Sequence, residues 1–275
     1  MMKGKVYLVG AGPGNPKLLT VRALEVFQEV DVVLYDRLVS KEILELIPAS
    51  VTMTDVGKAS HGSAGSQEEI NRIMVMEANN GNNVLRLKGG DPMLFSRGGE
   101  EIEALRSEDI DYEVVPGVSS ATGISSYIGL PLTHRKLSSS VTIVTGHEDP
   151  SKPEPSVDFG RLASVVDTLV ILMGTEKLHQ IAEKLVNAGT PLSRPVAIVE
   201  NGTRSDQRLT FSSLQKILDG ETKLEVSSPA LIVVGDVVRL ANGFPEIQED
   251  PDRFSDALQK ELMESKTWCA AAEYS

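Results

Sequence analysis

Short apolar runs alternate with helix-like patterns along the first half of the chain. The runs predict strands at residues 5–9, 31–35, 51–54, 83–87 and 112–115. Between them, apolar residues spaced by three or four predict helices over 20–29, 40–46, 67–78 and 100–106. Strands that alternate with helices in this way favour a mostly parallel sheet covered on both faces.

The pattern starts again after a crossing marked by glycine and proline at residues 127–131. Strands are predicted at 140–145, 168–173, 195–199, 207–212 and 230–234, and helices at 176–187 and 213–219. Three prolines within residues 148–156 predict a loop. We therefore predict two α/β domains with mostly parallel sheets, at residues 1–126 and 127–241.

The remaining residues, 242–275, form a predicted acidic tail. They contain eight acidic and three basic residues. Phe254, Leu258 and Leu262 recur every four positions, which allows a short amphipathic helix, and a solvated tail is the alternative.

Composition and charge narrow the classes of partner. The chain has 275 residues, a formal net charge of −12 and a pI near 4.9, which disfavours nucleic acid and anionic membranes as partners. Its one cysteine, Cys269, excludes an intrachain disulfide and favours the cytoplasm. The apolar run at 6–9 is too short for a signal peptide, and no run approaches the roughly 18 residues of a membrane span. We expect a cytoplasmic protein.

A glycine-rich loop at 10–14 follows the first predicted strand, and Asp36 ends the second. This arrangement allows a nicotinamide-dependent oxidoreductase, with Asp36 on a ribose. However, Asn15 stands where the third fingerprint glycine belongs, and Pro13 and Pro16 remove backbone N–H groups that a pyrophosphate needs. The long loop fits a cleft for a bulky ligand without phosphates better. A glycine turn without any ligand is the third possibility.

Ten short motifs in a fixed order carry a family resemblance over about residues 5–240. They lie at residues 6–14, 18–20, 35–39, 56–58, 86–92, 97–101, 115–121, 130–135, 145–147 and 173–174. Together they resemble the tetrapyrrole (corrin/porphyrin) methylases. The blocks at 35–39 and 97–101 are similar to those of family members that methylate uroporphyrinogen III.

The resemblance implies a methyltransferase with S-adenosyl-L-methionine bound between two α/β domains, as a homodimer. The reaction would methylate uroporphyrinogen III at C2 and C7 to give precorrin-2, in siroheme and cobalamin biosynthesis, and release S-adenosyl-L-homocysteine. The donor-binding positions carried over from the family motifs are Pro13, Gly89, Gly90, Asp91, Leu94, Ser119, Ser120, Met173, Gly202 and Ala230. A methyltransferase for another corrin precursor, or a protein that only binds the donor, remains an alternative.

The resemblance also assigns Asp36 as proton acceptor and Lys58 as proton donor. A carboxylate at a strand end is a suitable base for the proton that a methylated pyrrole must lose, although Asp36 can instead cap its loop or pair with Arg37. Lys58 can equally recognise a substrate carboxylate. The substrate carries eight carboxylates, and the basic residues in or beside the motif loops are candidates to bind them: Arg37, Lys41, Arg97 and Arg135.

Other polar residues are given structural roles. Arg86 and Lys88 are expected to pin the edge of the sheet. The four histidines, His61, His134, His147 and His179, lack metal-ligand spacing, so no metal site is predicted. The chain departs from the family pattern in three places. Ser96 stands in place of a glycine, and the serine pair at 119–120 in place of Thr-Ala. The stretch at 150–155 and the tail after Asn242 have no clear family counterpart.

Overall fold

A computed structural model of the chain describes residues 3–57, 66–147, 157–220 and 226–241. Residues Met1–Phe244 belong to one compact unit. The predicted acidic tail, the loop predicted at 148–156 and Lys58 lie outside the described residues.

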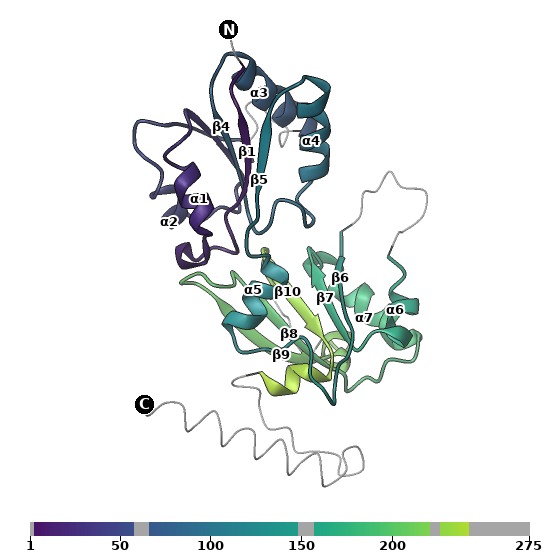
Figure 1. Ribbon diagram of the computed structural model, residues 1–275. Coiled ribbons are helices and arrows are strands. Elements are labelled where there is room, and N and C mark those ends of the chain that lie inside the picture. Colours follow the sequence, from purple (N-terminus) through teal and green to yellow (C-terminus); the bar gives the residue numbers. More distant parts are fainter. Residues whose placement is uncertain (1–2, 58–65, 148–156, 221–225, 242–275) are drawn as a thin grey trace, which may run out of the picture. The chain divides into compact units, whose positions relative to one another are not determined.

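Five parallel strands form the first sheet of the described chain. They are β1 (Val6–Gly10), β2 (Val32–Tyr35), β3 (Thr52–Asp55), β4 (Val84–Lys88) and β5 (Tyr112–Val115). Their order across the sheet is β3-β2-β4-β1-β5, with β4 in the middle, and Figure 1 shows β1 between β4 and β5. Every pairing is parallel, which confirms the prediction for this half of the chain.

Helices cover both faces of this sheet. Figure 1 shows α1 (Val21–Val26) and α2 (Lys41–Leu44) on one side, and α3 (Gln67–Asn79) and α4 (Gly98–Ser107) on the other. Side chains alternate along β1, so that Tyr7 and Val9 join one core while Val6 and Leu8 join the other. This explains the continuous apolar runs in the sequence, because both faces of each central strand are buried.

The caps of the first two helices differ from each other. Thr20 accepts a hydrogen bond from the Ala23 amide at 3.2 Å and so begins α1 as the sequence predicts. Ser40 precedes α2 but makes no side-chain cap; its hydroxyl donates to the Gly14 carbonyl at 2.7 Å. Ser40 therefore ties the glycine-rich loop to the start of α2.

The second sheet is mixed, which corrects the expectation of a mostly parallel one. Its strands are β6 (Val141–Thr145), β7 (Thr168–Leu172), β8 (Pro195–Glu200), β9 (Arg208–Ser213) and β10 (Ala230–Val234), in the order β6-β7-β10-β8-β9. Only β6 and β7 pair in parallel. The short connection at 201–207 makes β8 and β9 a hairpin, and β10 enters between β7 and β8 antiparallel to both.

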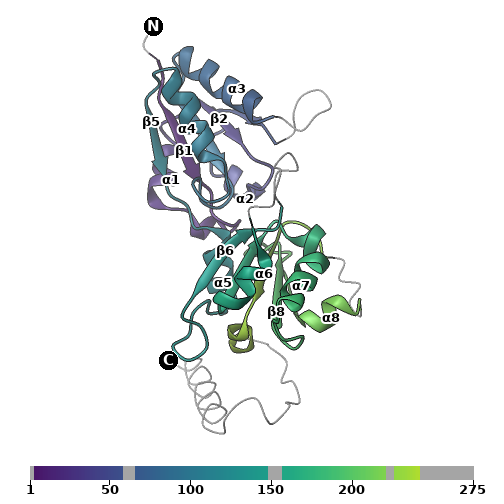
Figure 2. The same cartoon turned by 90° about the vertical axis from the view of Figure 1, so that its right-hand side faces the viewer.

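Four helices pack on this sheet within the described residues: α5 (Ser120–Tyr127), α6 (Phe159–Val165), α7 (Leu178–Asn187) and α8 (Leu214–Leu218). Figure 2 shows α7 and α8 side by side, and they share a core with α6. On the opposite face, α5 packs through Ala121 and Ile124. The short segments η1 (Pro16–Leu18), η2 (Thr175–Lys177) and η3 (Asp236–Leu240) are 3-10 helices.

Helices α5 and α6 were not predicted. The α5 sequence is rich in serine and glycine, which are weak helix formers, so burial of its apolar residues against the sheet decides its structure. The proposed domain boundary at residues 126–127 falls within α5, and it stays a prediction.

Glu113 on β5 gives a test of acid stability. It accepts hydrogen bonds from Lys5 Nζ at 2.7 Å and Arg22 Nε at 2.8 Å. The bonds from Arg22 and Lys5 lower the pKa of Glu113 from 4.5 to about 2. Because the pKa is lower in the folded state, this stabilisation is complete above about pH 4.5 and is lost as the pH falls towards 2.

We expect Glu113→Gln to lower the free energy of unfolding by about 1 kcal/mol at neutral pH, and by much less near the lower end of that window. Urea unfolding of the unsubstituted protein and of the Glu113→Gln variant, at neutral pH and at the lower end of that window, checks this. A loss of the same size at both would contradict the assignment.

Candidate active site

The loops that follow β1, β2, β4 and β5 leave the carboxyl ends of parallel strands and so share one edge of the first sheet. Gly12 and Gly90 join two of these loops: the Gly12 amide donates to the Gly90 carbonyl at 3.1 Å, and the Gly90 amide to the Gly12 carbonyl at 2.8 Å. A Cβ on Gly10 would lie 2.6 Å from the Gly117 Cα and from the Gly90 carbonyl oxygen. Only glycine permits this close approach of three backbone segments.

A cavity of about 450 Å³ opens beside these loops, and it is lined by loops that follow strands of the first sheet together with residues of the second sheet. This volume lies within the usual range for sites that bind small molecules and cofactors. Eight of the ten predicted donor-binding residues line the cavity: Pro13, Gly89, Gly90, Leu94, Ser120, Met173, Gly202 and Ala230. Arg37, a predicted substrate-binding residue, lines it as well.

The two other predicted donor-binding residues support the walls instead. Both oxygens of Asp91 accept backbone hydrogen bonds, Oδ1 from Met93 at 2.8 Å and Oδ2 from Gly117 at 3.1 Å. The Ser119 hydroxyl accepts from the Ala121 amide at 3.2 Å and begins α5. Asp91 thereby connects the loop after β4 to the loop after β5.

Several lining residues were not predicted from the sequence. They are Gly12, Leu38, Phe95, Ser96, Ile124, His147, Leu172, Thr175, Glu176, Asn201, Arg204, Ser228, Pro229 and Leu231. Most adjoin a motif residue, so proximity in sequence is the signal that would have found them. Arg204 is different, because it is a charged residue in the loop between β8 and β9.

Three lining residues other than glycine have a left-handed backbone: Phe95 at φ 54°, Met173 at φ 54° and Asn201 at φ 49°. This conformation is costly for residues with side chains and persists where surrounding contacts enforce it. Its recurrence around one cavity indicates that the wall is held in a fixed, functional shape.

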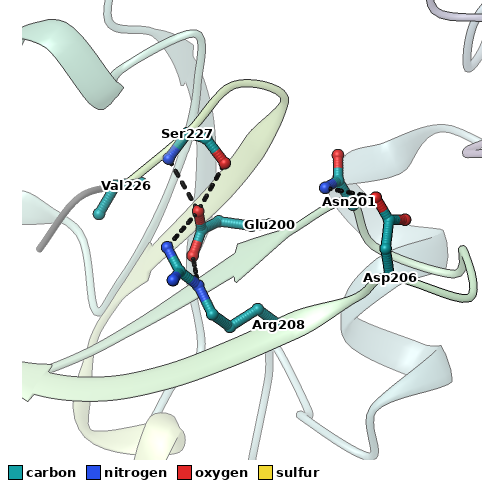
Figure 3. A pocket seen from close by; sticks show the side chains of 6 residues that line it. All are labelled: Glu200, Asn201, Asp206, Arg208, Val226 and Ser227. Carbon is teal, nitrogen blue, oxygen red and sulfur yellow. Dashed lines mark hydrogen bonds and ion pairs between the residues drawn. The ribbon is translucent and has the colours of Figure 1, made fainter.

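Figure 3 shows a second pocket, which shares Asn201 with the cavity and whose other residues hold this part of the wall in place. Glu200, which is buried at the end of β8, accepts hydrogen bonds from Arg208 and from both the amide and the hydroxyl of Ser227. The bonds from Arg208, set against burial, hold the pKa of Glu200 below its usual value. Asn201 and residues 228–230, which follow these partners in the chain, line the cavity.

A network of buried ionic side chains joins β4, α4 and the residue that follows β2. Arg86 Nη2 donates to Asp36 Oδ1 at 2.5 Å and Arg86 Nε to Glu101 Oε1 at 2.9 Å, while Lys88 Nζ donates to the same Glu101 oxygen at 2.7 Å. Arg86, Lys88 and Glu101 are almost fully buried. The expectation that Arg86 and Lys88 pin the sheet edge is wrong, because β4 is the central strand.

The network has opposite effects on its two cations. Burial disfavours the charge of Arg86, but the carboxylates of Asp36 and Glu101 outweigh burial and raise the pKa of Arg86. Burial, followed by the charge of Arg86, lowers the pKa of Lys88. The partner of Asp36 in this network is Arg86, where sequence reasoning had considered Arg37.

The other candidate residues for substrate binding and proton donation do not line the cavity or lie outside the described residues. Lys41 is exposed and lies 3.5 Å from Glu45, and Arg97 lies 3.2 Å from Glu100 at the start of α4. Arg135 is exposed, and these three do not line the cavity. Lys58 lies outside the described residues, so its role stays a prediction.

No group of three or more His, Cys, Asp or Glu side chains among the described residues is placed to hold a metal ion. No helix of the described chain has the length and apolar character needed to cross a membrane.

Comparison with known proteins identifies the family. The sequence profile of the Tetrapyrrole (Corrin/Porphyrin) Methylases matches residues 5–218. The chain belongs to this family.

Two curated relatives are equally similar in sequence but differ in how much of their length this chain matches. The S-adenosyl-L-methionine-dependent uroporphyrinogen III methyltransferase of Methanosarcina barkeri is 48% identical over 237 residues, which cover 86% of this chain and 93% of the relative. The siroheme synthase of Azotobacter vinelandii is also 48% identical, but the match covers 51% of it. The chain thus spans about half the length of the siroheme synthases that it matches.

A solved structure supports the same assignment of the fold. The uroporphyrin-III C-methyl transferase of Thermus thermophilus, complexed with S-adenyl homocysteine, superposes with a TM-score of 0.75 at 42% identity. The match covers 86% of this chain and 99% of that structure.

Proposed function

We propose that this protein transfers methyl groups from S-adenosyl-L-methionine to C2 and C7 of uroporphyrinogen III, giving precorrin-2 for siroheme or cobalamin biosynthesis. The observation that carries the proposal is the cavity, whose lining includes eight of the ten residues assigned to the donor by the family motifs. The relative from Methanosarcina barkeri is named as a uroporphyrinogen III methyltransferase, and the solved structure as a uroporphyrin-III C-methyl transferase, and both names support this substrate.

The cavity fits a bulky donor without phosphates. Gly12, Gly89 and Gly90 expose backbone from the first sheet, and Gly202 does so from the second. Pro13 and Leu94 add apolar surface, and the Met173 side chain is half exposed. The donor supplies an electrophilic methyl group, and the protein has to hold the pyrrole carbon in line with it.

Asp36 is the proposed base. It follows β2 directly and precedes Arg37 and Leu38, which line the cavity, and Arg86 donates a hydrogen bond to its carboxylate. Its side chain is 29% exposed, so part of it remains accessible. Lys58 is the proposed proton donor, while Arg37, Lys41, Arg97 and Arg135 are proposed to bind the carboxylates of the substrate.

A cytoplasmic homodimer completes the proposal. The absence of intrachain disulfide capacity and the family resemblance support these two points. Sedimentation of the purified protein tests the dimer separately from the activity.

The test is a turnover assay with uroporphyrinogen III and S-adenosyl-L-methionine, followed by mass spectrometry of the tetrapyrrole. We expect a gain of two methyl groups. Donor binding without this product would reject uroporphyrinogen III as the substrate and favour another corrin precursor. The nicotinamide alternative has lost its support, because the loop after β1 runs through η1 before α1 begins at Val21 and does not form a tight strand–helix turn.

Donor binding should depend on the backbone at Gly90. This residue has φ +70° and lines the cavity, so a β-branched side chain there is strained and enters the site. We expect Gly90→Val to weaken S-adenosylhomocysteine binding by about tenfold or more, as measured by calorimetric titration.

The matched control for this substitution is Gly99→Ala in α4. An added Cβ at Gly99 meets no atom within 4 Å. We expect this variant to bind the ligand like the unsubstituted protein. Unchanged affinity in Gly90→Val would show that the loop after β4 is not part of the donor site.

A further inference from the structure

Arg204 connects the second sheet to two loops of the first. It lies between β8 and β9, and its Nη2 donates to the Leu38 carbonyl at 2.5 Å. Its aliphatic arm lies against Gly14, where an added Cβ would be 2.8 Å from Arg204 Cγ. The hydroxyl of the neighbouring Thr203 accepts a hydrogen bond from the Asn15 amide at 3.1 Å, so Thr203 and Arg204 both contact the loop after β1. Arg204 lines the cavity at this point.

The charge of Arg204 has no carboxylate partner among the residues that the structure describes. Its Nε is buried without a hydrogen-bond partner. Eight other arginines of the described chain are paired with carboxylates: Arg22, Arg72, Arg86, Arg97, Arg161, Arg194, Arg208 and Arg239. A guanidinium has five N–H donors, and leaving them unmatched in a partly buried site is costly unless a ligand supplies acceptors.

We propose that Arg204 binds a carboxylate of the molecule held in this cavity. The inference rests on the proposed function, in which the donor carries one amino-acid carboxylate and the substrate carries eight. The planar guanidinium suits paired hydrogen bonds to a carboxylate better than an ammonium group does. The charged residues that line the cavity are Arg37, Arg204 and Glu176, a local positive excess within a chain of net charge −12.

Binding measurements on Arg204→Met and Arg204→Lys test the proposal and identify the source of the carboxylate. The methionine keeps the aliphatic arm and removes the charge, while the lysine restores the charge. The donor probe is S-adenosylhomocysteine, compared with methylthioadenosine, which lacks the carboxylate. The substrate probe is uroporphyrin III, an oxidised octacarboxylate. Arg161→Met, an exposed arginine on α6, is the control and should leave every affinity unchanged.

We expect Arg204→Met to weaken one probe by about tenfold or more, with partial recovery in Arg204→Lys. Weaker S-adenosylhomocysteine with unchanged methylthioadenosine identifies the donor carboxylate, and weaker uroporphyrin III identifies a substrate carboxylate. Affinities within twofold for all three probes would overturn the proposal. An equal loss of affinity for all three probes, without recovery in Arg204→Lys, would also overturn the proposal, because it would show that Arg204 only stabilises the structure.

These measurements do not depend on turnover. A protein that binds the probes as described but does not methylate uroporphyrinogen III would reject the proposed function and leave the role of Arg204 intact. Gly14→Ala offers a second route to the same site, because it displaces the Arg204 arm without removing its charge. It should weaken the same probe as Arg204→Met.

Discussion

Replacing Glu101 by glutamine should lower the free energy of unfolding by about 3–5 kcal/mol. Glu101 is fully buried, and one of its oxygens accepts from both Arg86 and Lys88. Glutamine keeps the volume but removes the charge, so two buried cations remain with Asp36 as their one carboxylate partner in the described network. The midpoint of urea unfolding measures the loss.

The pH dependence of this variant follows from Lys88. Burial and Arg86 already lower the pKa of Lys88 from 10.5, and Glu101 opposes that shift. Without Glu101 the pKa of Lys88 in the folded state falls further, so the unfolded chain binds more protons and stability rises with pH. We expect part of the loss to be recovered between neutral pH and about 10.5, where the unfolded lysine also releases its proton.

Glu100→Gln is the matched control on the same helix. Glu100 is half exposed and pairs with Arg97, so its substitution should change stability by less than about 0.5 kcal/mol. A loss below about 1 kcal/mol in Glu101→Gln would show that the buried cations do not depend on this carboxylate.

The first sheet could be predicted from the sequence because burial on both faces leaves continuous apolar runs. The second sheet could not be predicted as well, because the strands of β8–β10 carry similar apolar runs whether they pair in parallel or antiparallel. Helix α5 was missed because its serines and glycine do not favour a helix in isolation, whereas Ala121 and Ile124 are stabilised by the sheet.

The part of the site that consists of glycine residues could be predicted from the sequence. Gly89 and Gly90 stand in the motif at residues 86–92, and both line the cavity. The buried network was missed, because Arg86 and Lys88 alternate within an apolar strand and their partner Glu101 comes from a helix that follows. Arg204 was missed because its contacts with Leu38 and Gly14 join segments far apart in the chain.

Asp36→Asn should lower turnover of uroporphyrinogen III by about 10²–10⁴-fold, the usual contribution of a positioned base. The amide keeps the size of the side chain and can still contact Arg86, but it cannot take the proton released after methyl transfer. Asp36 does not line the cavity in which the donor is proposed to bind. S-adenosylhomocysteine affinity, measured by titration, should therefore remain unchanged.

Asp31→Asn makes the same substitution immediately before β2 and serves as the control. Asp31 Oδ2 accepts a hydrogen bond from the Asn83 amide at 2.8 Å, at the opposite end of the strand from the cavity, so turnover should be unaffected. If Asp36 instead contacted the donor ribose, Asp36→Asn would weaken the titration with S-adenosylhomocysteine as well. A variant with full turnover would remove Asp36 from the mechanism, and the Arg86–Asp36 pair would then be a structural link between β4 and the end of β2.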